Sequence, residues 1–133
     1  MENLIKFIEE LNQETKNAVL QETRNRKILR IYAKSENIFE RIAVASNFST
    51  PKDLFDDFVF DNDSRLRLAV IKNEISPEGS IDRLVDIETN CENEIALAQR
   101  AVISKSILEK FLKTHASNKE ACEIVRRRLN SCK

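Results

Sequence analysis

Residues that make turns and reactive sites are scarce in this chain. Its 133 residues include one glycine, two prolines, no tryptophan and a single histidine. Proteins built from β-sheets need turn residues between many short strands, so this composition disfavours a sheet fold. Because Gly79 is the only glycine, a glycine-rich loop that binds phosphates is excluded as well.

The cysteines and the histidine form no recognisable reactive motif. Cys91, Cys122 and Cys132 are odd in number and none belongs to a Cys-x-x-Cys pair, which disfavours a disulfide framework and a structural zinc site. A nucleophilic triad or a zinc site could use only His115, which we expect in a loop at a helix end, where a partial positive charge is favoured. The sequence therefore predicts no metal, no cofactor and no catalytic residue.

Long apolar runs are also missing. The first residues, MENLIKFIEELNQE, contain no basic leader followed by an unbroken apolar run. No later stretch approaches the roughly 20 apolar residues of a membrane span. We therefore expect a cytoplasmic protein that makes no membrane contact.

The residues that are abundant favour helices. Hydrophobic residues make up 41% of the chain and charged residues 33%, and the stretches rich in Leu, Ile, Glu, Lys and Arg have high helix propensity. The length suits one domain with its own core. The sequence predicts a single all-α domain over residues 1–133.

A tandem repeat occupies the middle of the chain. Residues 41–51 read RIAVASNFSTP and residues 67–77 read RLAVIKNEISP, so Arg, Ala, Val, Asn and Pro recur in the same order and at the same spacing. Downstream, the apolar positions also match, as Phe55 with Ile81, Phe58 with Leu84 and Val59 with Val85. A repeat of this length is typical of stacked helical units, each of which needs its neighbours to bury its apolar face.

A third, weaker unit follows at a slightly longer shift. IALA at 95–98 matches LAVI at 68–71, while Arg100 and Ser104 replace the Asn and Pro of the earlier units. We therefore expect about three helix-pair repeats over residues 41–114, each with a length of about 26–27 residues. Divergent cap helices would occupy residues 1–40, and a capping helix residues 115–133.

Residues that commonly begin or end helices lie at the predicted helix ends. Asn47 and Asn73 suit helix stops, because Asn tolerates the left-handed backbone conformation that commonly ends helices. Thr50-Pro51 and Ser76-Pro77 would each supply an N-cap hydroxyl followed by a proline in the first helical position. The small side chains of Ala43 and Ala69 would let neighbouring helices approach closely.

The pattern Arg-x-Ala-Val-Ala-x-Asn-x-x-Thr-Pro, followed by a leucine-type helix and an Asp-rich turn, resembles the leucine-rich repeat variant family. These proteins are helical relatives of HEAT and armadillo repeats. The resemblance is clearest over residues 41–85, tapers through Leu112, and implies a short right-handed α-solenoid. Some members hold a cysteine-ligated iron–sulfur cluster near the amino terminus, but no cysteine precedes Cys91 here, so that feature is not carried over. The family shares no catalytic residues, so the resemblance implies a fold and not an activity.

Acidic residues recur at the repeat spacing. The chain has no net charge, yet residues 50–94 carry 12 acidic and 5 basic side chains, while residues 95–133 carry 3 and 9. Asp56, Asp82 and Glu109 each lie one repeat apart, and Asp86 follows one helical turn after Asp82. Stacking would align these four acids on one face, which we expect to be the concave one.

These features favour a protein-binding module and not an enzyme. Its partner would be a basic protein that meets Asp56, Asp82, Asp86 and Glu109, and an immunity or antitoxin protein that covers a nuclease toxin is one form of this hypothesis. A second alternative is nucleic-acid binding by Arg126, Arg127 and Arg128. The zero net charge and the acidic middle disfavour nucleic acid, and nothing in the sequence indicates a small-molecule substrate.

Overall fold

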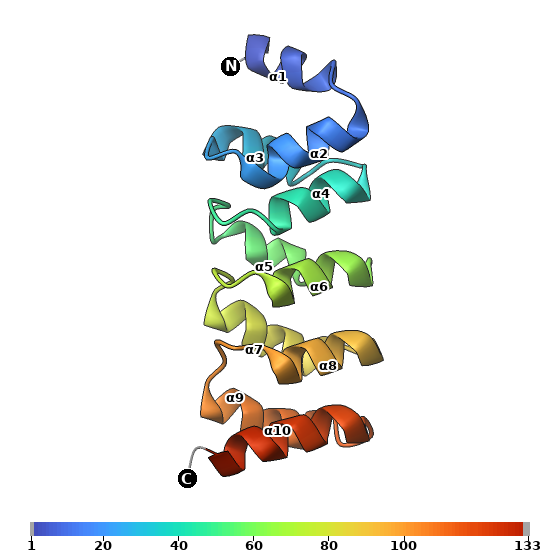
Figure 1. Cartoon of the computed structure of the whole chain (residues 1–133), viewed down its shortest axis with the longest axis vertical. Coiled ribbons are helices and arrows are strands. Elements are labelled where there is room, and N and C mark those ends of the chain that lie inside the picture. The colour runs from blue at the N-terminus through green and yellow to red at the C-terminus, as the bar shows by residue number, and fades with distance from the viewer. Residues whose placement is uncertain (1, 132–133) are drawn as a thin grey trace.

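The computed structural model describes residues 2–131, and every regular element in that range is an α-helix (Figure 1). The all-α prediction is therefore confirmed for these residues. The helices are α1 (Glu2–Glu9), α2 (Gln13–Glu22), α3 (Arg26–Tyr32), α4 (Ile38–Ala45), α5 (Leu54–Phe58), α6 (Ser64–Lys72), α7 (Glu78–Ile87), α8 (Cys91–Gln99), α9 (Lys105–Thr114) and α10 (Lys119–Ser131). No helix in this range is long and apolar enough to cross a membrane.

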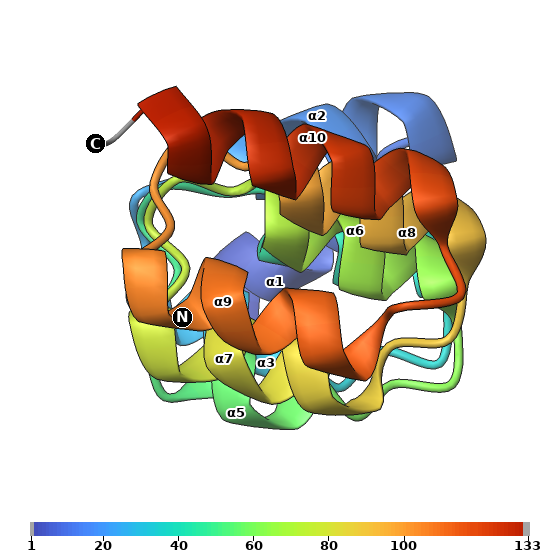
Figure 2. The same cartoon turned by 90° about the horizontal axis from the view of Figure 1, so that it is seen from below.

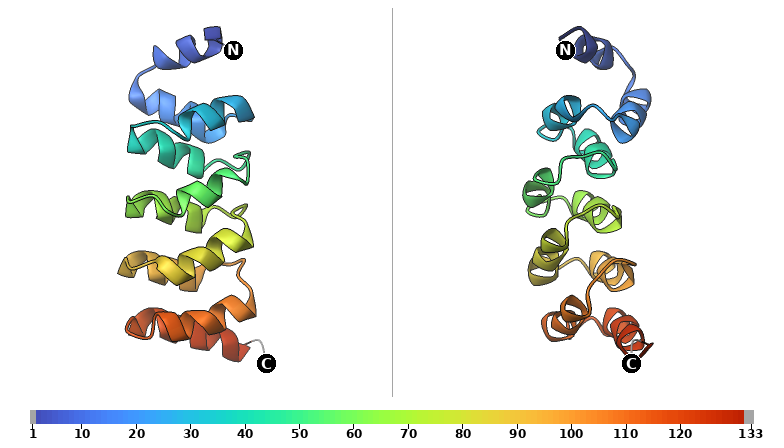
Figure 3. Two further views of the ribbon diagram at one scale, coloured as in Figure 1. Left: turned by 180° about the vertical axis from the view of Figure 1, so that it is seen from behind. Right: turned by 90° about the vertical axis from the view of Figure 1, so that its left-hand side faces the viewer.

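The helices from α2 onward form two stacked layers. The even layer contains α2, α4, α6, α8 and α10, and the odd layer contains α3, α5, α7 and α9 (Figures 1 and 2). The chain alternates between the layers, so each even helix packs on the even helix two elements later. The right panel of Figure 3 shows a shallow bend, with the even layer on its inner side. The small side chains of Ala43 and Ala69, both buried in the even layer, allow the close stacking that the inner side of a bend requires.

The core lies between the two layers, where the predicted apolar stripes are found. Val44, Val70 and Leu97 face it from successive even helices, and Phe55, Leu84 and Phe111 from successive odd helices; all six are fully buried. Burying each such side chain contributes about 1.5–3 kcal/mol relative to exposure. Apolar residues one repeat apart in the sequence therefore occupy equivalent buried positions in successive helices of a layer.

The asparagines of the repeat join one unit to the preceding one. The Asn73 side-chain amide donates to the carbonyls of Ala45 (2.8 Å) and Asn47 (3.1 Å), and Asn47 donates likewise to Leu20 and Thr23, both at 2.8 Å. The predicted left-handed helix stop is wrong, because Asn73 has φ −78° and ψ 115° and no residue in 2–131 has a positive φ. Their buried side chains instead donate to carbonyls at the end of the neighbouring even helix, where the last carbonyls have no partner within the helix.

The third and fourth units use arginine for the same purpose. Arg100 Nη1 donates to the carbonyls of Ile71 (2.6 Å) and Asn73 (2.9 Å). Arg128 Nη1 donates to those of Ala98 (2.8 Å) and Arg100 (2.7 Å). Burial lowers the pKa of the Arg100 guanidinium, with the charge of Glu74 acting against it. The third unit lacks the asparagine of the earlier units, but the arginine in its place makes the equivalent hydrogen bonds.

The predicted N-caps at Thr50 and Ser76 are also wrong. Their hydroxyls donate to the carbonyls of Val44 (2.5 Å) and Val70 (2.6 Å), within the preceding even helix. Pro77 takes the N-cap position of α7, which has no side-chain cap. A buried hydroxyl needs a nearby acceptor, and each of these carbonyls has a second lone pair for it beside the backbone amide that it already accepts.

Candidate functional site

The four acids predicted to bind a partner all lie in the odd layer. Asp56 is on α5, Asp82 and Asp86 are on α7, and Glu109 is on α9. The repeat spacing therefore brings them to one layer, as expected. That layer is the outer side of the bend in Figure 3, and not the concave side that we predicted.

Lys110 neutralises part of this acidic row. Its ammonium group forms ion pairs with Asp82 and, at 2.9 Å, with Asp86. Partial burial lowers the pKa of Lys110, but the bonds to the two carboxylates outweigh this effect and the pKa is raised. Glu109 lies 4.0 Å from Lys105 in an exposed pair. In residues 2–131, Asp56 is the only one of the four acids without an ion-pair partner.

Two partly buried ion pairs connect the two layers at the edge where the even helices begin. Arg41 pairs with Asp61 at 3.2 Å, and Arg67, one repeat later, pairs with Glu88 at 3.0 Å. Burial raises the pKa of Glu88, yet its bonds to Arg67, Asn93 and backbone amides lower the pKa by more. The basic member lies on the even helix in both units.

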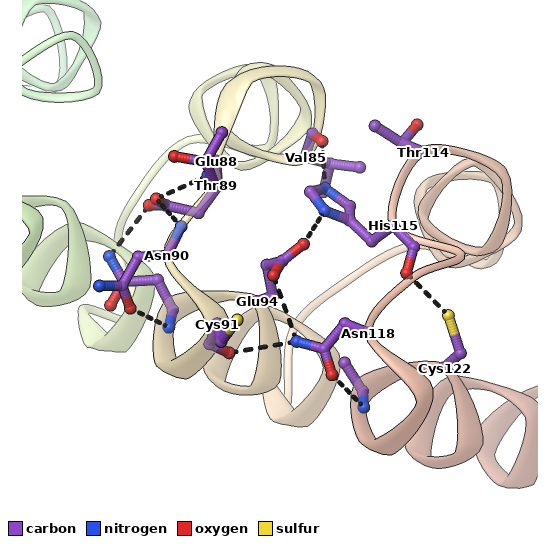
Figure 4. Close-up of polar contacts among 12 residues, drawn as sticks. Val85, Glu88, Thr89, Asn90, Cys91, Glu94, Thr114, His115, Asn118 and Cys122 are labelled. Carbon is purple, nitrogen blue, oxygen red and sulfur yellow. Dashed lines mark hydrogen bonds and ion pairs between the residues drawn. The ribbon is translucent and has the colours of Figure 1, made fainter.

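The third unit reverses the polarity of this pair (Figure 4). Glu94 occupies the position of Arg67, and His115 occupies that of Glu88, each one repeat later. His115 Nδ1 contacts the Glu94 carboxylate, and Nε2 donates to the Val85 carbonyl at 2.5 Å. His115 does end a helix, as predicted, but it is 4% exposed and lies inside the stack.

This geometry suits a structural role for His115. Both ring nitrogens are occupied, so neither is free to take a proton from a nucleophile or to bind a metal. Cys122 is buried and its thiol contacts the His115 carbonyl at 3.2 Å, whereas Cys91 is exposed. Cys132 lies outside the described residues. Within residues 2–131, no three His, Cys, Asp or Glu side chains are placed to hold a metal ion.

A hollow that the sequence did not predict lies on the solvent-facing surface of the even layer, the inner side of the bend. It lies between α4 and α6, has a volume of about 280 Å³, and includes Ile42, Leu68 and Ala69 in its lining. Phe48 borders it and is 67% exposed. Arg65 and Lys72 are the charged residues of its lining, and both are basic.

A second hollow lies on the other side of α6. It has a volume of about 210 Å³ and is lined by α6, α8 and the loop that follows α8, including Ile71, Ala96 and the 66%-exposed Val102. Lys72 lines both hollows. Three successive even helices thus present partly exposed apolar side chains around one lysine. The sequence does contain a sign of this surface, because the even helices carry apolar residues on a second side as well as on the core side. These are Ile42, Leu68 and Ile95, which are only half-buried in the stack.

The basic carboxyl-terminal helix is partly occupied by internal contacts. The guanidinium of Arg128 reaches back to three carbonyls at the end of α8. Arg127 pairs with Glu123 at the surface. Of the three arginines considered for nucleic acid, Arg126 alone makes no ion pair or side-chain hydrogen bond within residues 2–131.

Comparison of the chain with protein-family models, curated proteins and solved structures found no match. The resemblance to the leucine-rich repeat variant family therefore stays a prediction, based on residues 41–85.

Proposed function

We propose that this chain is a short right-handed α-solenoid of the leucine-rich repeat variant type, and that it works in the cytoplasm as a protein-binding module. The observation that carries the proposal is the apolar, solvent-facing surface of α4, α6 and α8, where two hollows flank α6. Side chains such as Phe48 and Val102 gain by leaving water, and no part of residues 2–131 covers them. The free thiols of Cys91 and Cys122 suit a reducing compartment.

The acidic row is the second candidate surface. Asp56, Asp82, Asp86 and Glu109 share one layer, which favours a basic partner such as the nuclease toxin of an immunity pair. Asp82 and Asp86 would have to exchange Lys110 for a partner's cation, and that exchange reduces the gain in free energy. On the even layer, Lys72 requires no such exchange, and we therefore propose that layer as the main partner-binding surface.

Site-specific photo-crosslinking in the cells that make the protein separates the two surfaces. A photo-crosslinking residue replaces Leu68 or Ile95 on the even layer, or Asp56 on the odd layer as a matched control. We expect one and the same protein adduct from positions 68 and 95 and none from position 56. An adduct from position 56 alone would move the function to the acidic row. Absence of adducts from all three positions contradicts the protein-binding proposal.

A polarisation titration with labelled duplex and single-stranded nucleic acid tests the remaining alternative. Nucleic-acid binding by the basic end would weaken steeply with salt, because phosphate contacts release counterions. We expect no salt-dependent binding at micromolar protein. Binding that disappears in an Arg126→Glu variant would instead favour the nucleic-acid function.

A further inference from the structure

The charges beside the two hollows of the even layer are mostly of one sign. Arg65 and Lys72 line the hollow between α4 and α6, and neither an aspartate nor a glutamate does. Arg65 is paired with Asp63 and lies over the Phe39 ring. Lys72 is exposed and makes no ion pair within the part of the chain that the structure describes, residues 2–131. Glu74, which lines the second hollow, is the one acid in either lining.

The hollows are large enough to hold side chains. A cavity of about 150 Å³ accommodates one benzene ring, and the two hollows measure about 280 and 210 Å³. Each can therefore receive one large apolar side chain from a partner. The lysine between them can receive a carboxylate, and an ion pair at a partly desolvated position gains more than one in open water.

The spacing of the hollows restricts the backbone of the occupant. They lie on the two sides of α6, so their separation is about the 8–10 Å between packed helix axes. A polyproline II segment has three residues per turn and rises about 3.1 Å per residue, which places side chains i and i+3 on one face about 9 Å apart. Side chains i and i+3 of a β-strand point to opposite faces, so a strand fits less well.

From these features, and resting on the proposed function, we infer that the even layer binds an extended acidic segment of another protein. Its apolar side chains i and i+3 fill the hollows on the two sides of α6, and a carboxylate between them pairs with Lys72. Ile42 and Leu68 contact the first anchor, and Ala96 and Val102 the second. The exposed Phe48 ring packs on the segment beside the first hollow.

Three synthetic peptides test the chemistry of this surface against the full chain. The probe is Leu-Glu-Pro repeated three times, which places leucines at i and i+3 and a glutamate between them. The charge control is Leu-Lys-Pro repeated three times, and the anchor control is Ala-Glu-Pro repeated three times. A titration followed by ¹H–¹⁵N NMR at up to millimolar peptide detects weak binding and locates it.

We expect the Leu-Glu-Pro peptide to shift the amides of α4, α6 and α8, and both control peptides to bind at least tenfold more weakly. Lys72→Glu should weaken the probe at least tenfold, and Leu68→Asp should abolish its binding. Asp56→Lys, on the odd layer, should leave it unchanged. Circular dichroism of each variant checks that the helices are retained.

Two results overturn the inference. One is equal binding of the acidic and basic peptides, and the other is binding that Lys72→Glu leaves intact. The inference is also overturned if the Leu-Glu-Pro peptide fails to bind at millimolar concentration. If crosslinks from positions 68 and 95 still appear, the protein-binding function stands and only the partner's chemistry is wrong. If the crosslinks also fail, both proposals fall.

Discussion

In or just after α4, α6, α8 and α10, one side chain donates to two carbonyls at the end of the preceding even helix. Asn47 and Asn73 do so with an amide, and Arg100 and Arg128 with a guanidinium. A net hydrogen bond is worth about 0.5–1.5 kcal/mol, and a buried acceptor left unpaired costs about 1–3 kcal/mol. These residues therefore stabilise the stack out of proportion to their size.

Asn73→Ala tests this at the residue scale. The substitution leaves the carbonyls of Ala45 and Asn47 without their side-chain donor, so we expect a loss of about 2–3 kcal/mol in the free energy of unfolding. Urea denaturation measures it. The matched control is Asn62→Ala, an exposed asparagine in the turn after α5, which should change stability by less than about 0.5 kcal/mol. Similar values for the two variants would contradict the role of Asn73.

Glu88 should make the free energy of unfolding depend on pH. The pKa of its carboxyl is lowered from its ordinary value of 4.5 in the folded chain, so the unfolded state binds more protons in the acid range and stability rises with pH there. The stabilisation by Glu88 is therefore complete above the unfolded pKa and is lost as the pH falls through the lower, folded pKa.

Glu88→Gln should cost about 3 kcal/mol at pH 7, because the largely covered guanidinium of Arg67 loses its anionic partner. The difference from the parent chain should shrink as the pH falls below about 4.5, the ordinary pKa of a glutamate. Urea unfolding at pH 7, 5, 4 and 3 measures both. A cost that is constant over this range would show that Glu88 does not act through its charge.

At the scale of elements, the third unit differs from its neighbours in the polarity of one ion pair. The even helices α4 and α6 place arginine at this position, whereas α8 places Glu94 there and His115 directly follows α9. The packing places a basic side chain opposite a carboxylate across the layers, but it does not fix which layer carries which of the two.

A double-mutant cycle tests whether the polarity can be exchanged. Glu94→Arg alone puts two basic groups together, and His115→Glu alone puts two carboxylates together, so each should destabilise by about 3–5 kcal/mol. The double variant recreates the pairing of Arg67 with Glu88. Thermal or urea unfolding should give it a loss at least about 1 kcal/mol smaller than the sum of the single losses, since contacting residues couple by about 0.5–3 kcal/mol. Additive losses would mean that packing and not charge selects these side chains.

The whole molecule is a stack in which most contacts join elements close in sequence. Stability in such an array is distributed along the stack and is lowest at its ends. The amino-terminal end is the weaker one, because Ile8 is the only buried residue of α1 while Leu4 and Phe7 are 41% and 59% exposed. In contrast, α6 contributes Leu66, Ala69, Val70 and Ile71 to the core.

Hydrogen exchange should therefore be fastest in α1 and slowest in α6. Opening of α1 needs little free energy, whereas exposure of α6 requires separation of the units on both sides. We expect protection in α6 to exceed that in α1 by about a thousandfold or more, measured by exchange with mass spectrometry or NMR. Equal protection throughout would indicate that the stack unfolds only as one unit.

Local sequence patterns were enough to predict the helices, the recurring segments, the buried stripes and the sharing of one layer by the four acids. These properties follow from local periodicity: side chains at the helical period share a helix face, and side chains one repeat apart share a place in successive units. That is why Phe55, Leu84 and Asp82 lie in one layer, whereas the side of the bend on which this layer lies did not follow from their spacing.

The roles of the polar residues, in contrast, depend on how the units pack. Asn73, Arg100, His115 and Lys110 each act through a partner that is about one repeat distant in sequence, and the best partner depends on distances set by the packing of two units. The hollows beside Lys72 arise in the same way, from the gaps between neighbouring even helices. Periodicity fixes the direction in which a side chain points, whereas contact between units fixes what it meets.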